Sequence, residues 1–284
     1  MKSIKKIHQP VYEPIQDLVT YRAIPTPSIN YLDPFLFLNH HGPQTYAPNN
    51  SGLPFGPHPH RGMETVTFIL EGDIAHFDSS GGKSVIEAGG VQWMTAGRGL
   101  IHAEVSSDEF KRKGGPLEIL QLWINLPAQS KMNEPFYKGL HKEAIPTVKL
   151  DEGRVQVNLV SGEWHGKQGP FHSGIGAQLA TINFKSGGHW QMVIPESNNI
   201  FFYLIQGELN VNGQVIQERS LVEFEREGQQ LKLVANKASV LLLGYAPPLN
   251  EPVVSQGPFV MNTREEIEQA YEDYQNGKFG RWVH

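Results

Sequence analysis

The chain has 284 residues, of which 39% are hydrophobic and 19% are charged, and its formal net charge is -5. This composition is typical of a globular protein with a sizeable core, and it lacks the basic character that nucleic-acid binding requires. Because there is no cysteine, disulfides, thiolate nucleophiles, zinc ribbons and iron–sulfur clusters are excluded. Any metal must therefore be held by nitrogen and oxygen.

The first residues, MKSIKKIHQPVYEP, carry lysines without an apolar stretch behind them, so they do not resemble a secretory signal. The densest apolar run, residues 238–248, is too short to cross a bilayer. We therefore expect a cytoplasmic protein with no membrane contact. The basic run KRKGG, residues 111–115, leaves nuclear targeting as an alternative, although a solvated loop is the more common meaning of such a run.

Two histidines stand one residue apart in GPHPHRG, residues 56–62. The prolines before His58 and His60 favour extended backbone, in which residues i and i+2 point to the same side. Both imidazoles can therefore converge on one point. The segment predicts two nitrogen ligands of a metal site.

A second pair of candidate ligands follows in GRGLIHAE, residues 97–104, where His102 and Glu104 are again separated by one residue. If both segments are neighbouring strands, their side chains can meet and form a site of three histidines and one carboxylate. Such a donor set suits Fe(II), Mn, Co, Ni, Cu or Zn, and it leaves up to two positions of an octahedral ion open for chemistry.

Other residues near these pairs leave alternatives open. Glu64 is a ligand, a hydrogen-bond partner of a histidine or a rim residue, and we favour the partner role. Arg61 supplies positive charge at the rim or pairs with Glu64. The same His-x-carboxylate spacing occurs in His76 with Asp78 and in His141 with Glu143, and it is interpreted as chance there. The lone His189 of the second half is interpreted as a surface or core residue.

Short runs rich in β-branched and aromatic residues, bounded by glycine and proline, predict an all-β sandwich or barrel. FILEGDI (residues 68–74) and YLIQGEL (203–209) are alike and lie about half a chain apart, which indicates two similar β domains. The polar, proline-marked segment 128–153 predicts the connection, with domains at 1–135 and 136–284. No histidine pair of this spacing recurs in the second half, so only the first domain is expected to bind metal.

One amphipathic helix is predicted near the C-terminus, within NTREEIEQAYEDYQNGKFG. Thr263 and Glu266 fit a capping box, and Gly277 lies where a helix would stop. The apolar positions of this helix are Ile267, Ala270, Tyr271 and Tyr274.

At these residues the chain resembles a cupin, and more closely the pirin family. Gly52, His58, His60, Glu64 and Gly72 match the first cupin motif, and Gly97, Gly99 and His102 carry the second, with Gly97 where many cupins have proline. The segments PHPHRGMETVTFILEG, GGVQWMTAGRGLIHAE and NEPVVSQGPFVMNTREEIEQAYEDYQNGKFG are similar to pirin sequences, and the resemblance extends over essentially the whole chain.

The resemblance implies two tandem cupin barrels of the double-stranded β-helix (jelly-roll) type with a C-terminal helix. It also implies one metal, usually iron, in the first barrel. In most cupins the position of Glu64 supplies a ligand, whereas in pirins the carboxylate comes from the position of Glu104. The implied ligands are therefore His58, His60, His102 and Glu104, with Glu64 outside the metal sphere and no metal in the second barrel.

The resemblance leaves two functions to weigh, because the family contains quercetinases and transcriptional cofactors. As an enzyme the chain cleaves a flavonol such as quercetin with O2 and releases carbon monoxide, and Glu104 acts as general base. Phe55, Phe68, Trp93 and Met94 can contribute to an apolar mouth. The alternative is a non-catalytic, iron-binding redox sensor that acts through a protein partner, and a structural metal in an inert barrel is a weaker third. We favour the enzyme and expect a monomer.

Overall fold

The computed structural model describes residues 1–283, and the chain divides into two compact units that are described separately. We call them the first barrel (residues 12–22, 35–143 and 249–283) and the second barrel (residues 1–11, 23–34 and 144–248). The predicted all-β fold with two barrels and a C-terminal helix is confirmed. Among the described residues, no helix is long and apolar enough to cross a membrane.

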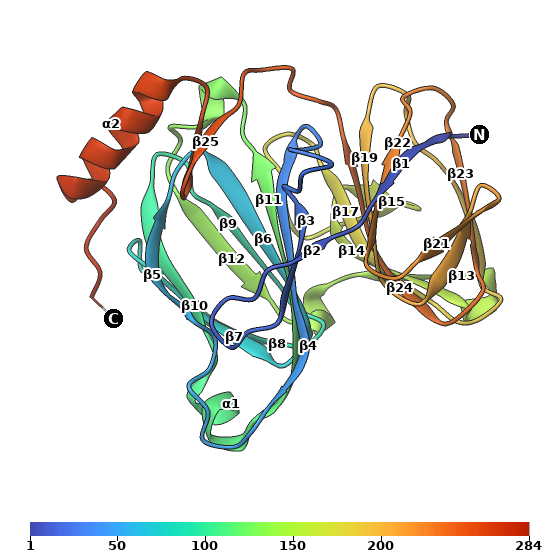
Figure 1. Cartoon of the computed structure of the whole chain (residues 1–284), viewed down its shortest axis with the longest axis horizontal. Coiled ribbons are helices and arrows are strands. Elements are labelled where there is room, and N and C mark those ends of the chain that lie inside the picture. Colours follow the sequence, from blue (N-terminus) through green and yellow to red (C-terminus); the bar gives the residue numbers. More distant parts are fainter. Residues whose placement is uncertain (284) are drawn as a thin grey trace. The chain divides into compact units, whose positions relative to one another are not determined.

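The first barrel is built from a seven-stranded and a four-stranded antiparallel sheet (Figure 1). In the larger sheet the order of the strands is β12 (Phe136–Leu140), β9 (Val91–Thr95), β6 (Met63–Glu71), β11 (Gly115–Asn125), β4 (Phe35–Tyr46), β3 (Thr20–Ile24) and β2 (Val11–Tyr12). The smaller sheet has the order β5 (Phe55–His60), β10 (Leu100–Val105), β7 (Asp73–Asp78) and β8 (Lys83–Glu87). The apolar side chains between them include Ile69, Ile74, Ile86 and Leu117.

The second barrel repeats this pairing of a seven-stranded with a four-stranded sheet. The larger sheet has the order β1 (Ile4–His8), β22 (Ser220–Phe224), β19 (Asn199–Gln206), β24 (Ser239–Ala246), β17 (Gln178–Phe184), β14 (Val155–Ser161) and β13 (Thr147–Leu150). The smaller sheet has the order β18 (His189–Val193), β23 (Gln230–Ala235), β20 (Glu208–Val211) and β21 (Gln214–Gln217), and β15 (Glu163–Trp164) pairs with β16 (Lys167–Gln168). Its hydrophobic core includes Phe202, Leu204 and Leu241.

The two similar segments found in the sequence occupy equivalent places in the two barrels. Gly72 separates β6 from β7, and Gly207 separates β19 from β20. Both glycines have a positive φ, 84° and 92°, which a residue with a Cβ adopts only under strain. The internal repeat therefore marks the same turn in each barrel.

The C-terminal segment, residues 249–283, belongs to the first barrel and not to the second. It contains β25 (Val254–Gln256), β26 (Phe259–Met261) and α2 (Arg264–Gln275), and Figure 1 shows α2 beside β25. Phe259, Ile267 and Phe279 form an apolar cluster with the half-buried Ile101 of β10. We predicted two continuous domains, 1–135 and 136–284, whereas each unit of the structure combines separate segments of the chain. Pairing between distant segments leaves no local pattern in the sequence that could reveal this.

The predicted capping box begins α2. The Thr263 side chain accepts a hydrogen bond from the Glu266 N–H at 3.2 Å, and a Glu266 carboxylate oxygen accepts one from the Thr263 N–H at 3.0 Å.

The basic run at 111–113 is not a loop: it forms the last turn of a short helix, α1 (Asp108–Lys113), where lysine and arginine suit the negative end of the helix dipole. Single 3₁₀ turns lie at Ala128–Ser130, Lys142–Ala144 and Asp151–Gly153.

Candidate metal centre

The two predicted histidine segments are neighbouring strands. β5 and β10 pair antiparallel, and His58 lies directly opposite His102. Because side chains alternate along a strand, His58 and His60 leave β5 on the same side. The period of two that was visible in the sequence therefore brings three imidazoles together.

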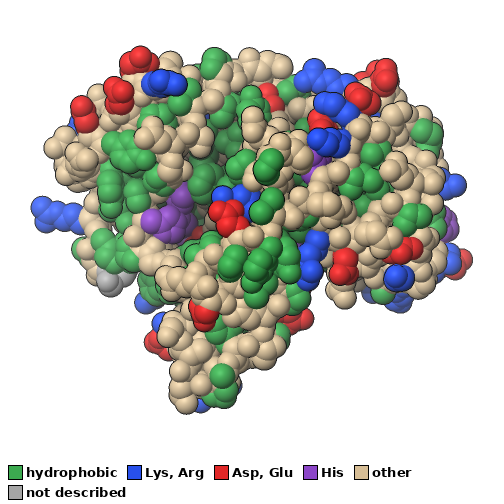
Figure 2. All heavy atoms as spheres, viewed as in Figure 1, with side chains coloured by type: hydrophobic (Ala, Val, Ile, Leu, Met, Phe, Trp, Pro, Cys, Tyr) green, Lys and Arg blue, Asp and Glu red, His purple; other side chains and the backbone are tan. Residues whose placement is uncertain are grey.

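The three histidines form a compact cluster. One ring nitrogen from each of His58, His60 and His102 lies within 4.8 Å of the other two, and the His58 and His102 Nε2 atoms are 3.0 Å apart. His60 and His102 are buried, whereas His58 is partly exposed. In Figure 2, histidine side chains reach the surface of this barrel among hydrophobic side chains. The cluster is thus accessible from one side.

Backbone carbonyls fix the orientation of two of these rings. His58 Nδ1 lies 2.7 Å from the Gly56 carbonyl oxygen, and His60 Nδ1 lies 3.1 Å from the Pro258 carbonyl oxygen. Since a carbonyl only accepts, each Nδ1 carries the proton and each Nε2 keeps its lone pair. The buried His60 Nε2 has no hydrogen-bond partner in residues 1–283. This arrangement fits a metal ion, because metal-binding histidines commonly donate their other ring N–H to such a group.

Burial also keeps His60 and His102 neutral. It lowers the pKa of His60 to about 3, with a further contribution from His58. The pKa of His102 lies well below its ordinary value for the same reason, aided by the neighbouring histidines. At neutral pH these two imidazoles are uncharged, which is the form that binds metals.

Glu104 lies on the same strand but is held by other side chains. The Thr67 hydroxyl donates to one carboxylate oxygen at 2.7 Å, and the Gln121 amide donates to the other. An irregularity in the β5–β10 register falls between His102 and Glu104. In the part of the chain that the structure describes, Glu104 is not in the group of ligand atoms within 4.8 Å, so its role as a ligand stays a prediction.

Within residues 1–283, Glu64 makes no hydrogen bond to a histidine, so the hydrogen-bonding role that we favoured for it is wrong. Gly62, with φ of 83°, separates β5 from β6, and the two strands belong to different sheets. On β6, Glu64 lies on the face opposite to Thr67, and the Thr95 hydroxyl donates to it at 2.9 Å. Burial raises its pKa to about 7, against the effect of this hydrogen bond.

Arg61 is neither a rim charge nor a partner of Glu64. Arg61 is 3% exposed, and its side chain forms an ion pair with Asp273 of α2, with 2.9 Å between Nη1 and Oδ2. The guanidinium also lies 4.7 Å from the centre of the Phe279 ring. Arg61 therefore connects the strand of the histidine pair to the C-terminal helix.

One pair that the sequence analysis set aside lies beside the cluster. His76 is 5.4 Å from His102, measured between ring centroids, and it stacks on Tyr137 at 3.6 Å. His76 Nε2 is 2.9 Å from an Asp78 carboxylate oxygen, and both residues are buried. Burial raises the pKa of Asp78, but hydrogen bonds from His76, Ser80 and Gly82 outweigh it and leave the pKa below its ordinary value. The sequence signal that could have identified this pair was its His-x-Asp spacing.

The aromatic residues beside the histidines differ in part from those expected. Phe55 lies opposite Glu104 on the paired strands, with its ring 5.1 Å from His41, whereas Phe68, Trp93 and Met94 are core residues with exposures of 1%, 3% and 2%. Sequence analysis missed the stacked, half-buried pair of Phe37 and Trp123, whose ring centroids are 4.5 Å apart. The Trp123 ring lies 5.2 Å from His60.

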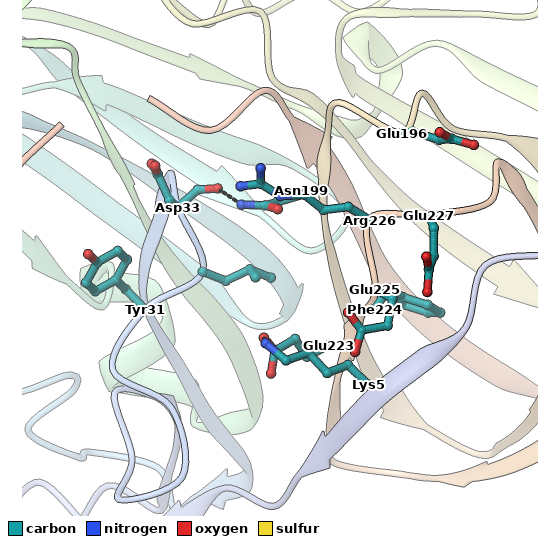
Figure 3. A pocket seen from close by; sticks show the side chains of 11 residues that line it. Lys5, Tyr31, Asp33, Glu196, Asn199, Glu223, Phe224, Glu225, Arg226 and Glu227 are labelled. Carbon is teal, nitrogen blue, oxygen red and sulfur yellow. Dashed lines mark hydrogen bonds and ion pairs between the residues drawn. The ribbon is translucent and has the colours of Figure 1, made fainter. Parts of the chain in front are cut away.

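A pocket in the second barrel has a different chemistry. It has a volume of about 610 Å³, and Figure 3 shows several of its lining carboxylates, among them Glu196, Glu223 and Glu227. The Asn199 amide donates to the Asp33 carbonyl there at 2.6 Å. None of the described residues that line it is a histidine, so they do not offer the donor set of the first barrel.

Two barrels of this topology, with a histidine cluster inside the first, define a cupin-type protein with the donors for one metal ion. Residues 17–124 match the family model described as Pirin, and residues 179–280 match the Pirin C-terminal cupin domain. The chain belongs to the pirin family.

Known proteins similar to this chain carry two kinds of name. It is 40% identical to Pirin-like protein 2 of Arabidopsis thaliana, over 98% of this chain and 85% of the relative. It is 37% identical to a Pseudomonas aeruginosa protein named "Putative quercetin 2,3-dioxygenase", over 94% of this chain and 92% of the relative. A crystal structure titled quercetin 2,3-dioxygenase from Acinetobacter baumannii superposes with a TM-score of 0.93 at 33% identity and covers both chains completely.

Proposed function

We propose that this protein is a metal-dependent dioxygenase that cleaves flavonols such as quercetin with O2 and releases carbon monoxide. The observation that carries the proposal is the cluster of three imidazoles, two of them aligned by backbone carbonyls, at an accessible face of the barrel. The names of the Pseudomonas and Acinetobacter proteins support the choice of reaction.

His58, His60 and His102 would hold the ion, with Glu104 as the fourth ligand that the pirin resemblance implies. We infer iron(II) as the physiological metal, because three nitrogen donors and one carboxylate suit it. The same donors also accept Mn, Ni, Co, Cu or Zn. When bound, iron supplies Lewis acidity and one-electron chemistry with O2.

The protein's own groups then have separate tasks. The Glu104 carboxylate takes the proton from the 3-hydroxyl group of the flavonol, as a general base held by Thr67 and Gln121. Phe37 and Trp123 offer a flat apolar surface beside His60 for the aromatic rings of the substrate. The burial of His60 and His102 limits the access of bulk water to one side of the site.

The test is aerobic quercetin consumption by protein reconstituted with Fe(II), followed by the loss of flavonol absorbance and by carbon monoxide release. His58→Ala and His102→Ala are expected to abolish turnover. His141→Ala is the matched control, because it makes the same change at an exposed histidine and is expected to leave turnover unchanged.

Wild-type protein that binds iron stoichiometrically but leaves quercetin intact would refute the proposed reaction. The iron-binding redox sensor with a protein partner would then become the leading function. A loss of turnover in His141→Ala equal to that in His58→Ala would instead refute the assignment of the site.

A further inference from the structure

The C-terminal segment contacts the metal cluster directly. Its β25–β26 hairpin turns at Gly257 and Pro258, where Gly257 has a positive φ of 57°. The Pro258 carbonyl oxygen accepts the hydrogen bond from His60 Nδ1 at 3.1 Å. A residue 198 positions away in sequence therefore sets the tautomer of one candidate ligand.

The residue after His60 is tied to the same segment twice. The Arg61 carbonyl oxygen accepts from the Val260 N–H at 3.0 Å, and the Arg61 side chain pairs with Asp273 at 2.9 Å. Arg61 Nε also donates to the Arg98 carbonyl oxygen at 2.6 Å. Because both charged side chains are buried, removing the Asp273 charge leaves the Arg61 guanidinium without its carboxylate partner in a poorly solvated place.

A third contact follows at the next residue. The ammonium group of Lys131, which is 1% exposed, donates to the Gly62 carbonyl at 2.8 Å, to the Val260 carbonyl at 3.1 Å and to the Asn125 side chain at 2.6 Å. Three consecutive residues, 60 to 62, are therefore linked to the C-terminal segment. A segment that only covered the barrel would not need hydrogen bonds to His60, a candidate ligand, and to the two residues after it.

We propose that the C-terminal segment is a positioning element of the metal centre, in which Arg61 and Asp273 hold the Pro258 carbonyl against His60. This inference rests on the proposed ligand set. Docking of the segment orients the His60 ring, so it raises the affinity for metal. By linkage, a bound metal stabilises the docked segment to the same extent.

The first experiment measures Ni(II) affinity of the full-length protein by calorimetric titration. Asp273→Asn keeps the size of the side chain but removes its charge, which loosens the Pro258 carbonyl that orients His60. Loss of a group bonded to a ligating histidine usually weakens metal binding by about 10- to 100-fold, and Ni(II) binding is expected to weaken within this range. Lys278→Met is the matched control, because Lys278 contacts the same carboxylate at 2.7 Å but is 61% exposed. Its Ni(II) affinity should stay within about twofold of wild type.

The second experiment needs no variant and therefore does not depend on the folding of Asp273→Asn. Hydrogen exchange of wild-type peptides covering residues 249–279 is expected to slow when Ni(II) is added. The same peptides in His58→Ala should show no slowing. Equal exchange with and without Ni(II) in wild type would overturn the proposal.

The remaining outcomes separate this inference from the proposed function. Asp273→Asn with a lower melting temperature but wild-type Ni(II) affinity would show that the segment is only structural, and the metal centre would stand. Wild-type protein that binds no Ni(II) and no Fe(II) would overturn the ligand set and this inference with it.

Discussion

Replacing Glu64 with glutamine is expected to change how stability depends on pH. Glu64 is 2% exposed, and burial raises its pKa from the ordinary 4.5 to about 7. Between these values the folded chain keeps a proton that the unfolded chain has released. The stabilisation from this proton is complete below about pH 4.5 and is lost as the pH rises through about 7.

The size of the effect follows from the same two values. Each pH unit in this window corresponds to about 1.4 kcal/mol, so the free energy of unfolding of the wild type should fall by about 3 kcal/mol relative to Glu64→Gln. Comparison of the two proteins cancels the contributions of His60 and His102, which titrate in both.

The assay is urea unfolding at pH 4.5 and pH 8. Unfolding is monitored by hydrogen exchange of peptides from β6 and β9, so that the first barrel is measured separately. Glu71→Gln, an exposed position on the same strand, is the control and should show little pH-dependent difference. A difference between wild type and Glu64→Gln that is equal at both pH values would refute the reasoning. If Glu64→Gln lost as much Ni(II) affinity as His60→Ala, Glu64 would have to be counted among the metal ligands.

Three further substitutions test separate parts of the structure. Glu104→Gln should lower kcat for quercetin at least about 100-fold, and an unchanged kcat would exclude Glu104 as the base. Gly62→Ala places a Cβ 2.0 Å from the Val260 carbonyl oxygen at a positive φ, so it should cost about 1–3 kcal/mol in thermal or urea unfolding and weaken Ni(II) binding. Leu204→Ala in the core of the second barrel should cost about 2–5 kcal/mol without changing Ni(II) affinity, and metal loss in this variant would argue against a site confined to the first barrel.

The fold was predictable because its signals are local. The runs at 64–70, 117–127 and 239–245 alternate or continue as buried strands, and the structure contains β6, β11 and β24 there. The α2 helix was predictable for the same reason, since its cap and its apolar spacing lie within a few residues. Pairing between distant segments was missed. The short strand β1, for example, pairs with β22, which lies more than 200 residues away.

The candidate site divides in the same way. The spacing of His58 and His60 is a property of one strand, so it could be found in the sequence. The ion pair of Arg61 with Asp273 joins residues that are 212 positions apart, and no local sequence pattern around either residue predicts it. Spacing alone also could not separate two His-x-carboxylate pairs: His76 is buried beside the cluster, whereas His141 is exposed.

The long sequence distance between His60 and Pro258 has a consequence for the order of biosynthesis. The ribosome must add 198 residues after His60 before the carbonyl that aligns it exists. At about 5–20 residues per second this takes roughly 10–40 seconds, during which residues 144–248 of the second barrel are completed. The first barrel is thus completed only after the second, and His60 gains its carbonyl partner only after residue 258 has been added.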